Sequence, residues 1–563
     1  MKQKIINLLE KNVEGLNREE ISALIEIPPK PELGDFAFPC FRLAKTMRKA
    51  PQMIAADIKE AIGDVDFLQE ISVQGAYLNF FIKKEIFVKT MVEAASAENF
   101  GGSNVGEGKT ICIDYSSPNV AKNFHVGHLR TTIIGNSLYK IYSKLGYDVK
   151  RINHLGDWGT QFGKLIVAYK AWGNEEAVKS DGVGELMKLY VKFHDEAKNN
   201  PALDDEARAW FVKMEQGDEE ALKIWQWFKD ISLIEYKRTY DLLGMDFDYY
   251  LGESFYRDKT DDIVDRLTKG NLLTESEGAK IVDLEAYDMA PCLILKNDGS
   301  SIYATRDLAA IFYRKETHNF VKCLYVTGQE QKLHFAQVFK VVELLGNEWA
   351  KDQLIHIPYG LVSLEGAKLS TRSGNIIYAE DILLEAISKV KEIISEKNPD
   401  LADKDETAKK IGVGAVLFND LYNQRIKDVS FKWEKLLNFD GETGPYVQYT
   451  YARCSSILRK LENYDENAAI DYSLITDAES IDLLKEINRF PQVVVDASEK
   501  YEPSQIARFA VAVAQTFNKF YNANRINIED ENLKNARVAL VKLTRNTIKD
   551  AMLLLGIDCP EQM

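Results

Sequence analysis

The sequence predicts three parts in order: a small α+β domain, an α/β domain with a doubly wound parallel sheet, and an all-helical domain. Two observations support this prediction. The apolar, β-branched run Thr110–Tyr115 is followed by turn residues, a helical pattern and a second strand-like run, Tyr147–Asn153. Strand–helix–strand units of this kind build parallel sheets. From Ala379 onward the pattern favours helices only, which is typical of a helical bundle.

The first 105 residues are expected to form the α+β domain. A helical pattern opens it, the mixed segment Gly34–Lys45 follows, and Ile71–Ile82 alternates like a single strand. The segment Ala97–Lys109 is rich in glycine and predicts a linker.

Residues 106–380 are expected to form the α/β domain, and residues 381–563 the helical domain. The charged helical region Glu175–Lys237 predicts an insertion over about residues 170–250 of the α/β domain. A helix is predicted over Gln331–Leu345. Further sheet-like segments are Ala279–Leu284, Cys292–Leu295, Lys322–Val326 and Leu354–Ile357.

Size and charge narrow the class of protein. A chain of 563 residues suggests about three or four domains. The composition, 45% hydrophobic and 28% charged, is that of a globular protein and excludes a disordered or collagen-like one. The net charge of −15 argues against non-specific coating of nucleic acid, so RNA contacts would need local basic patches.

Targeting and metal-binding signals are not evident. No stretch approaches the ~18 apolar residues of a membrane span, and the charged N-terminal pattern differs from a secretory signal. We therefore expect a cytoplasmic protein without membrane contact. The six cysteines are scattered and form no CxxC pair, so we expect reduced thiols and no structural metal.

The first motif with chemical meaning is His125-Val126-Gly127-His128. It lies after a predicted strand and at the start of a predicted helix. A helix N-terminus offers free N–H groups and partial positive charge, which attract phosphate, and Gly127 lets a flat group approach the backbone. Taken alone, the two histidines could equally bind a metal or be structural.

The second motif is the basic segment from Lys368 to Asn375, KLSTRSGN. A loop of this composition can close over a polyphosphate and neutralise its charge. Taken alone, the segment is more typical of a solvated surface turn.

Together and in this order, the two motifs resemble the HIGH and KMSKS signatures of class I aminoacyl-tRNA synthetases. The flanking segments resemble arginyl-tRNA synthetases over essentially the whole chain: GDFAFPCFRLAK, SSPNVAKNFHVGHLRTTIIGNSL, INHLGDWGTQFG, YATRDLAA, GPYVQYTYAR and the terminal methionine. The resemblance implies a Rossmann-like class I catalytic domain. It also implies a ligase that converts L-arginine and ATP to arginyl-adenylate, then transfers arginine to the terminal ribose of an arginine-accepting tRNA.

The resemblance also implies roles in ATP binding. His125 and His128 would stabilise the α-phosphate, while Lys368 and Arg372 would meet the β- and γ-phosphates. The second lysine of the signature is Thr371 here, and Lys122, just before the first motif, is implied to replace it. Mg²⁺ would arrive with ATP. The remaining implied ATP residues are Gly127, Asp157, Gly159 and Ser370.

An arginine pocket should be acidic, because a guanidinium is planar and always charged and pairs with carboxylates. The resemblance points to Asp307, with Tyr303 one helical turn earlier. Ser117 and Asn119 are implied to hold the α-amino and carboxylate groups. Asp114, Glu253 and Gln331 complete the implied pocket. Each alone could also be a surface residue or a helix cap.

The implied tRNA contacts lie outside the catalytic domain. Tyr77 and Asn79 share one face of the predicted Ile71–Ile82 strand and are implied to meet the tRNA elbow. Gln74 is out of phase and could join them only through a bulge near Gly75. Tyr521 and Met563 are implied to pack against the anticodon loop. The arrangement suggests a monomer along which the tRNA lies.

Three other functions remain open from the residues alone. A synthetase for glutamate should have a basic pocket, and one for cysteine should carry zinc ligands. A nucleotidyltransferase would leave the helical domain unexplained. A non-catalytic RNA-binding or scaffold protein would be favoured by loss of His125, His128 or Lys368, all of which are present. The altered signature with Thr371 predicts that arginine activation requires tRNA.

Overall fold

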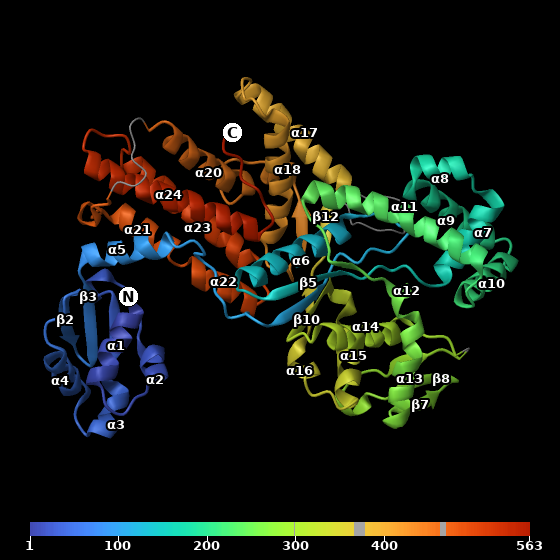
Figure 1. The fold of residues 1–563 in the computed structure, drawn as a ribbon, viewed down its shortest axis with the longest axis horizontal. Coiled ribbons are helices and arrows are strands. Elements are labelled where there is room, and N and C mark those ends of the chain that lie inside the picture. Colours follow the sequence, from blue (N-terminus) through green and yellow to red (C-terminus); the bar gives the residue numbers. More distant parts are fainter. Residues whose placement is uncertain (298, 365–377, 462–468) are drawn as a thin grey trace. The chain divides into compact units, whose positions relative to one another are not determined.

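The computed structural model describes residues 1–563 except 298, 365–377 and 462–468, and its centre is a five-stranded parallel sheet (Figure 1). The strands lie in the order β11-β10-β4-β5-β6, so the strand order reverses between β4 and β10. Ligands of open α/β sheets bind outside the carboxyl ends of the strands at such a switch point. The strands are β4 (Thr110–Asp114), β5 (Asp148–Asn153), β6 (Tyr249–Tyr250), β10 (Lys322–Gly328) and β11 (Leu354–Tyr359).

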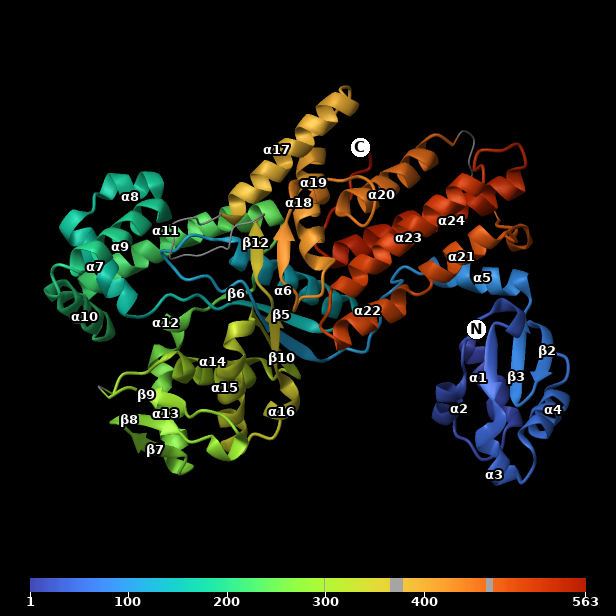
Figure 2. The same ribbon diagram turned by 180° about the vertical axis from the view of Figure 1, so that it is seen from behind.

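Helices cover both faces of this sheet (Figures 1 and 2). Helix α6 (Val126–Lys144) connects β4 to β5 and is buried along most of its length. On the opposite face, α14 (Tyr303–His318) and α15 (Lys332–Leu344) pack against Cys112, Ile152 and Cys323, and α16 (Ala350–Gln353) precedes β11. The predicted strand–helix–strand unit is confirmed.

The predicted helical insertion is also confirmed. It has its own core, built around Trp158, Phe162, Trp210 and Phe228. Its helices are α7 (Thr160–Trp172), α8 (Glu175–Asp181), α9 (Val183–Ala197), α10 (Ala202–Glu215) and α11 (Glu219–Leu243). After β6 come helices α12 (Glu253–Tyr256) and α13 (Thr260–Lys269). Strands β7 (Leu273–Ser276), β8 (Ala279–Val282) and β9 (Cys292–Leu295) then form a separate antiparallel sheet.

Among the described residues after Ala379, the regular elements are helices with one exception. Strand β13 (Val429–Phe431) pairs in parallel with β12 (Val362–Leu364), which the expectation of helices only missed. Three residues are too few for periodicity to reveal a strand, and its partner is distant in sequence. The helices are α17 (Ala379–Lys397), α18 (Lys404–Leu421), α19 (Trp433–Leu436), α20 (Gly444–Arg459), α21 (Ala478–Ile487), α22 (Phe490–Glu499), α23 (Ser504–Ala523) and α24 (Glu531–Leu554).

The N-terminal region corrects one prediction. The segment Ile71–Ile82 is a hairpin of two strands, not a single strand, with Gly75 at positive φ in its turn. Gln74 therefore lies directly opposite Tyr77, and no bulge is needed to bring it near. The elements are α1 (Lys2–Asn12), α2 (Arg18–Leu24), β1 (Phe36–Pro39), α3 (Leu43–Met47), α4 (Pro51–Ile62), β2 (Leu68–Gln74), β3 (Tyr77–Ile82) and α5 (Lys84–Ala95).

Contacts group the chain into two compact units. The first unit comprises residues 1–100, 457–489 and 515–546, and the second comprises 101–456, 490–514 and 547–563. The predicted limits of 1–105, 106–380 and 381–563 stay a prediction. None of the helices in the described residues is both long enough and apolar enough to cross a membrane.

The side chain of Arg130 links helix α6 to segments of the second unit that lie far from it in sequence. Its side chain is fully buried and lies 3.4 Å from the Asp420 carboxylate of α18. Its two terminal nitrogens donate to the carbonyl oxygens of Gly360, Leu361, Arg425 and Lys427, at 2.8–3.0 Å. One guanidinium thus fastens α6 to β12, to the segment before β13, and to α18.

We expect Arg130→Met to destabilise the second unit by about 3–5 kcal/mol, because it leaves Asp420 buried without its cation. Urea unfolding followed by tryptophan fluorescence measures this, since all seven tryptophans lie in the second unit. Arg208→Met breaks an exposed pair with Asp205 in the same unit and should cost at most about 1 kcal/mol. Equal small losses in both variants would contradict the anchoring role.

Candidate active site

A cavity of about 750 Å³ opens at the carboxyl ends of β4 and β10, where the strand order reverses. It brings together most of the predicted ATP and arginine residues of the described chain. These are Asp114, Ser117, Asn119, His125, Gly127, His128, Glu253, Tyr303, Asp307 and Gln331. The switch-point position agrees with the general rule for open α/β sheets.

The two histidines of the first motif cap helix α6. The Nδ1 atom of His125 accepts the Gly127 N–H at 3.0 Å, and the Nδ1 atom of His128 accepts the His125 N–H at 3.3 Å. The rings stack with centroids 3.9 Å apart. A ring nitrogen that accepts cannot carry the proton, so each neutral imidazole has its proton on Nε2. Both rings therefore offer an N–H donor beside the helix N-terminus.

Burial and neighbouring charge keep these rings neutral. Burial lowers the pKa of His125, and the Lys122 ammonium lowers it further. Burial together with His125 and Lys122 lowers the pKa of His128 well below 6.5. Lys122 does not line the cavity but is half-buried next to it, and burial lowers its pKa as well. The positive potential of the site comes from Lys122 and the helix rather than from charged imidazoles.

The loop before these histidines is conformationally constrained. Ser116, Ser117 and Ala121 have positive φ, a region that costs energy for residues other than glycine. The buried Tyr236 hydroxyl donates to the carbonyl oxygens of Asn119 and Lys122. A Cβ at Gly156 would lie 2.1 Å from Oδ1 of Asn119, so only glycine leaves room for that amide. The surrounding structure thus holds Asn119 at the cavity wall.

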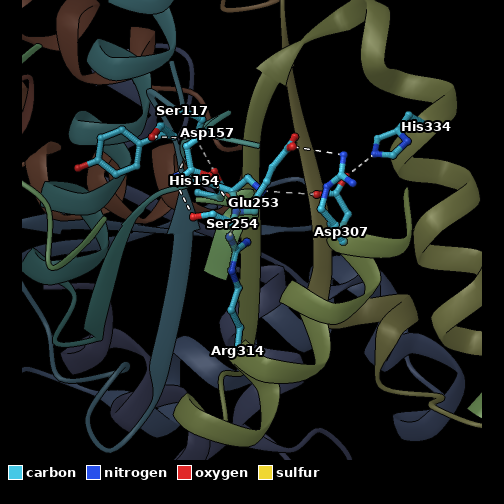
Figure 3. Close-up of polar contacts among 11 residues, drawn as sticks. Ser117, His154, Asp157, Glu253, Ser254, Asp307, Arg314 and His334 are labelled. Atoms are coloured by element: carbon cyan, nitrogen blue, oxygen red, sulfur yellow. Dashed lines mark hydrogen bonds and ion pairs between the residues drawn. The ribbon is translucent and has the colours of Figure 1, made fainter. Parts of the chain in front are cut away.

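The acidic side of the cavity centres on Asp307 (Figure 3). His334 Nε2 donates to its Oδ2 at 2.6 Å, and His154 Nε2 lies 3.9 Å from its Oδ1. Burial alone would raise the pKa of Asp307, but the hydrogen bond and charge of His334, with His154 and Arg314, hold it below its usual value. Tyr303 is exposed, and its ring lies 4.9 Å from that of His334. Asp307 is therefore a carboxylate held ionised by imidazoles.

Two further acids of the cavity, Asp114 and Glu253, have internal arginine partners. Asp114 pairs with the buried Arg314 at 2.7 Å and accepts from the Ser117 hydroxyl at 2.8 Å. Glu253 lies 3.3 Å from the Arg306 guanidinium. Burial raises the pKa of Glu253 to about 7, with Arg306 opposing and Asp307 and Asp157 adding to the rise. Of the three acids, Asp307 has the carboxylate least committed to an internal cation.

Several predicted residues lie outside this cavity. The Asp157 carboxylate is fully buried, binds Lys229 at 2.6 Å and accepts from Ser254. Gly159 begins α7. Neither residue lines the cavity, because the chain after β5 turns into the insertion. Lys368, Ser370 and Arg372 lie outside the described residues.

The predicted tRNA residues are spread over both units. In the first unit, Gln74 is exposed, Tyr77 is half-buried against the ring of Phe41, and Asn79 is only 3% exposed. The deep burial of Asn79 follows from its central strand, which pairs on both sides. Tyr521 lies in α23 of the first unit with 37% of its surface exposed. Met563 lies in the second unit, beside α17.

Sequence reasoning missed two cavity residues that define the acidic side, His154 and His334. His154 directly follows β5, so its place at the carboxyl end of a strand was a usable signal. His334 lies three residues after Gln331, one helical turn along α15. The other cavity residues not predicted are Ser116, Val126, Thr131, Tyr325, Val326, Thr327, Gly328, Glu330, Phe335, Tyr359, Gly360, Leu361 and Val362.

The fold and the cavity agree with what comparison with known proteins shows. Residues 90–433 match the family model "tRNA synthetases class I (R), catalytic domain". Residues 1–82 match "Arginyl tRNA synthetase N terminal domain", and residues 447–563 match "DALR anticodon binding domain". The parallel sheet, the cavity at its switch point and this match define a class I aminoacyl-tRNA synthetase, a class whose members use ATP.

Similar proteins cover the full length. The chain is 53% identical to the arginine–tRNA ligase of Alkaliphilus metalliredigens, over 100% of this chain and 99% of the relative. It is 55% identical to that of Clostridium perfringens over 97% of each chain. The solved arginyl-tRNA synthetase of Thermus thermophilus is 25% identical, with a TM-score of 0.80, over 100% of this chain and 99% of that one. The chain belongs to the arginyl-tRNA synthetase family, and the predicted resemblance is confirmed.

We expect the His128 ring to stay neutral, with its proton on Nε2, at pH 6.0. Its pKa lies well below 6.5, whereas a free histidine would be mostly protonated there, since its pKa is about 6.5. Ring ¹⁵N chemical shifts of labelled protein report both the charge and the tautomer, with His128→Ala assigning the signal. A charged ring at pH 6.0, or a proton on Nδ1, would contradict the capping geometry.

Proposed function

We propose that this protein is an arginine–tRNA ligase that joins L-arginine to its cognate tRNA for protein synthesis. It first activates L-arginine with ATP to arginyl-adenylate, then transfers arginine to the 3′-terminal ribose of the tRNA. One observation carries the proposal: a single cavity holds a phosphate-type helix N-terminus with two imidazole donors and, on its other side, the ionised Asp307. Family membership supports it.

The first step needs positioning and positive charge rather than a protein nucleophile. The arginine carboxylate attacks the α-phosphorus of ATP, and pyrophosphate leaves. Charge develops on the α-phosphate oxygens, where the Nε2–H groups of His125 and His128 would donate and Lys122 would add positive charge. Lys368 and Arg372 would meet the β- and γ-phosphates, with Ser370 and Gly127 as further ATP contacts. Mg²⁺ would arrive bound to ATP as part of the substrate.

Arginine recognition follows from the acidic side of the cavity. Asp307 and Glu253 would accept the guanidinium, with Tyr303 packing beside it and Asp114, already paired, adding negative potential. Asn119, Ser117 and Gln331 would bind the α-amino and carboxylate groups. A lysine side chain lacks a planar fork of donors and would leave carboxylate oxygens without partners, so the site should reject it. A glutamate enzyme would need a basic pocket, and these acidic residues do not provide one.

The tRNA would contact regions beyond the cavity. Gln74 and Tyr77, opposite each other on the N-terminal hairpin, are suited to an unpaired base through stacking and amide contacts. The buried Asn79 would support them rather than reach far out. Tyr521 and Met563 would contact the anticodon region. We further propose that the protein is a cytoplasmic monomer. Asp157 and Gly159 would support the nucleotide pocket without lining the cavity.

The test is ATP–pyrophosphate exchange with each amino acid, with and without tRNA. We expect exchange with arginine alone, and only when tRNA is present. Exchange with arginine in both conditions would keep the ligase but remove the tRNA requirement. Silence with every amino acid, from folded protein, would overturn the function.

A matched pair of variants controls this experiment. Asp307→Asn should reduce kcat/KM for arginine about 30- to 160-fold, since a charged pair worth about 2–3 kcal/mol is lost. Asp288→Asn, an equal change at an exposed site, should leave it unchanged.

Arginine binding should release protons near neutral pH. The Glu253 carboxyl has a pKa of about 7 in the unliganded site, so roughly half of it is protonated at pH 7. A bound guanidinium favours the ionised form, so affinity should rise as the pH increases from 6 to 8. Calorimetric titration in buffers of different ionisation heat should find up to about half a proton released at pH 7. Glu253→Gln should abolish the release; an unchanged release in this variant would exclude Glu253.

A further inference from the structure

Two buried cysteines lie side by side in the parallel sheet. In the pairing of β4 with β10, Cys112 and Cys323 are direct partners. Both belong to the core that packs against α14 and α15, so their side chains lie on the same face of the sheet. Neighbouring strands are about 4.8 Å apart, a separation between Cα atoms that a disulfide can span. Both thiols are free, and the strand pairing alone brings them together.

The cysteine pair lies next to the active site. Asp114 and Tyr325 follow the cysteines by two residues on the same two strands, and both line the cavity. In the described part of the chain, neither cysteine lines the cavity itself. Because alternate residues of a strand share a face, the cysteines form the layer directly below this part of the cavity wall. A small molecule in the cavity is therefore one layer of side chains away from the thiols.

A buried guanidinium lies close to the same thiols. Arg314 is 1% exposed, and its Nη2 atom lies 2.7 Å from the Asp114 carboxylate and 3.3 Å from Nδ1 of His154. Figure 3 shows its side chain reaching from α14 toward His154. Its Nε and Nη1 atoms have no hydrogen-bond partner among the described residues. Buried donors without partners are costly, and a nearby thiolate would compensate their positive charge.

The two thiols differ in acidity. Burial would raise the pKa of Cys323, but hydrogen bonding with Cys112 and the charge of Arg314 lower it below its ordinary value. Hydrogen bonding with Cys323 and burial raise the pKa of Cys112. Cys323 is therefore the sulfur that becomes a thiolate, and Cys112 keeps its proton. A thiolate reacts with oxidants, and a neighbouring thiol can convert the first product to a disulfide.

We propose that Cys112 and Cys323 are a modification site for hydrogen peroxide, at which a reversible disulfide forms in the folded protein. The Cys323 thiolate attacks one peroxide oxygen, the O–O bond breaks, and the leaving hydroxide takes up a proton to become water. Cys323 is then a sulfenic acid. The Cys112 sulfur attacks it, the S–O bond breaks, and the Cys112 proton leaves with the hydroxide as a second water. Two electrons pass from the thiols to the peroxide, and a dithiol such as dithiothreitol reverses the change.

The disulfide should weaken arginine binding, a consequence that rests on the proposed function. It removes the negative charge of the thiolate, which opposes the charge of Arg314. The charge of Arg314 acts on Asp114 and on Asp307 in the cavity. A less compensated Arg314 repels an incoming guanidinium. We expect the KM for arginine to rise about 3- to 10-fold, with a smaller change in kcat.

The test maps the thiols of folded protein after treatment with hydrogen peroxide. Free thiols are first alkylated in denaturant with a light reagent, and thiols released by reduction are then alkylated with a heavy one. Mass spectrometry should find the heavy label on Cys112 and Cys323 and the light label on Cys292, a buried cysteine of the same core. Untreated protein should carry the light label at all three. The KM for arginine is measured by pyrophosphate exchange with tRNA, before oxidation, after it, and after reduction with dithiothreitol.

Two variants complete the test. Cys323→Ala should show no effect of peroxide on the KM, whereas Cys292→Ala should respond like the wild type. The proposal is overturned if both cysteines of the pair keep the light label, or if the heavy label appears only at urea concentrations that unfold the chain. A mapped disulfide with an unchanged KM would overturn the link to the pocket. Absence of exchange in untreated wild type would overturn the function, while the label pattern would still decide whether the disulfide forms.

Discussion

The interaction on which the catalytic unit depends is the buried guanidinium of Arg130. It lies two residues after His128 and binds four backbone carbonyl oxygens and Asp420. An arginine can satisfy so many acceptors at once because its donors form a fixed planar fork. Burial raises the pKa of Asp420 to about 6 even with Arg130 opposing, which shows how far this site is from water. The helix that presents His125 and His128 is thereby held against β12 and α18.

The segment just before α6 also contacts the residues that follow 365–377 in sequence. Tyr378 forms a backbone bridge with His125, and its hydroxyl accepts from the Asn123 amide at 3.1 Å. The Ala379 N–H donates to the Phe124 carbonyl at 2.9 Å. Residues before Lys368 and residues after Asn375 are therefore both fastened to the segment that carries the histidine pair. In sequence the two motifs are some 240 residues apart, and these contacts bring their surroundings together.

The partners of the acidic side chains in and around the cavity follow from charge balance. Several carboxylates are buried there, and each needs a cation or hydrogen-bond donors, since an unpaired buried charge is costly. Asp114 has Arg314 and Glu253 has Arg306, while Asp157, which lies outside the cavity, has Lys229. Asp307 has only imidazoles, which can lose their proton or move. Of the carboxylates of Asp114, Glu253 and Asp307, that of Asp307 is therefore best suited to take a guanidinium from outside.

Elements with a strong hydrophobic periodicity or a distinctive motif could be predicted from the local sequence alone. Thr110–Tyr115, the helix after His125 and the helical insertion follow from side-chain periodicity, and the two motifs with their flanks indicated the family. The sequence also identified ten residues that line the cavity, since residues at strand ends of one sheet meet at one edge.

Only the tertiary structure decided what depends on partners distant along the chain. In the structure, β13 pairs with β12 and Ile71–Ile82 forms a hairpin. The Asp157 carboxylate binds Lys229 and Ser254 and does not line the cavity. The tertiary structure also supplied His154 and His334 as the partners of Asp307. Periodicity records which face of an element is buried, but it does not record which charged group lies across from it. The sequence by itself therefore determined the class of the protein and the place of its site, and packing decided which carboxylates were left for a substrate.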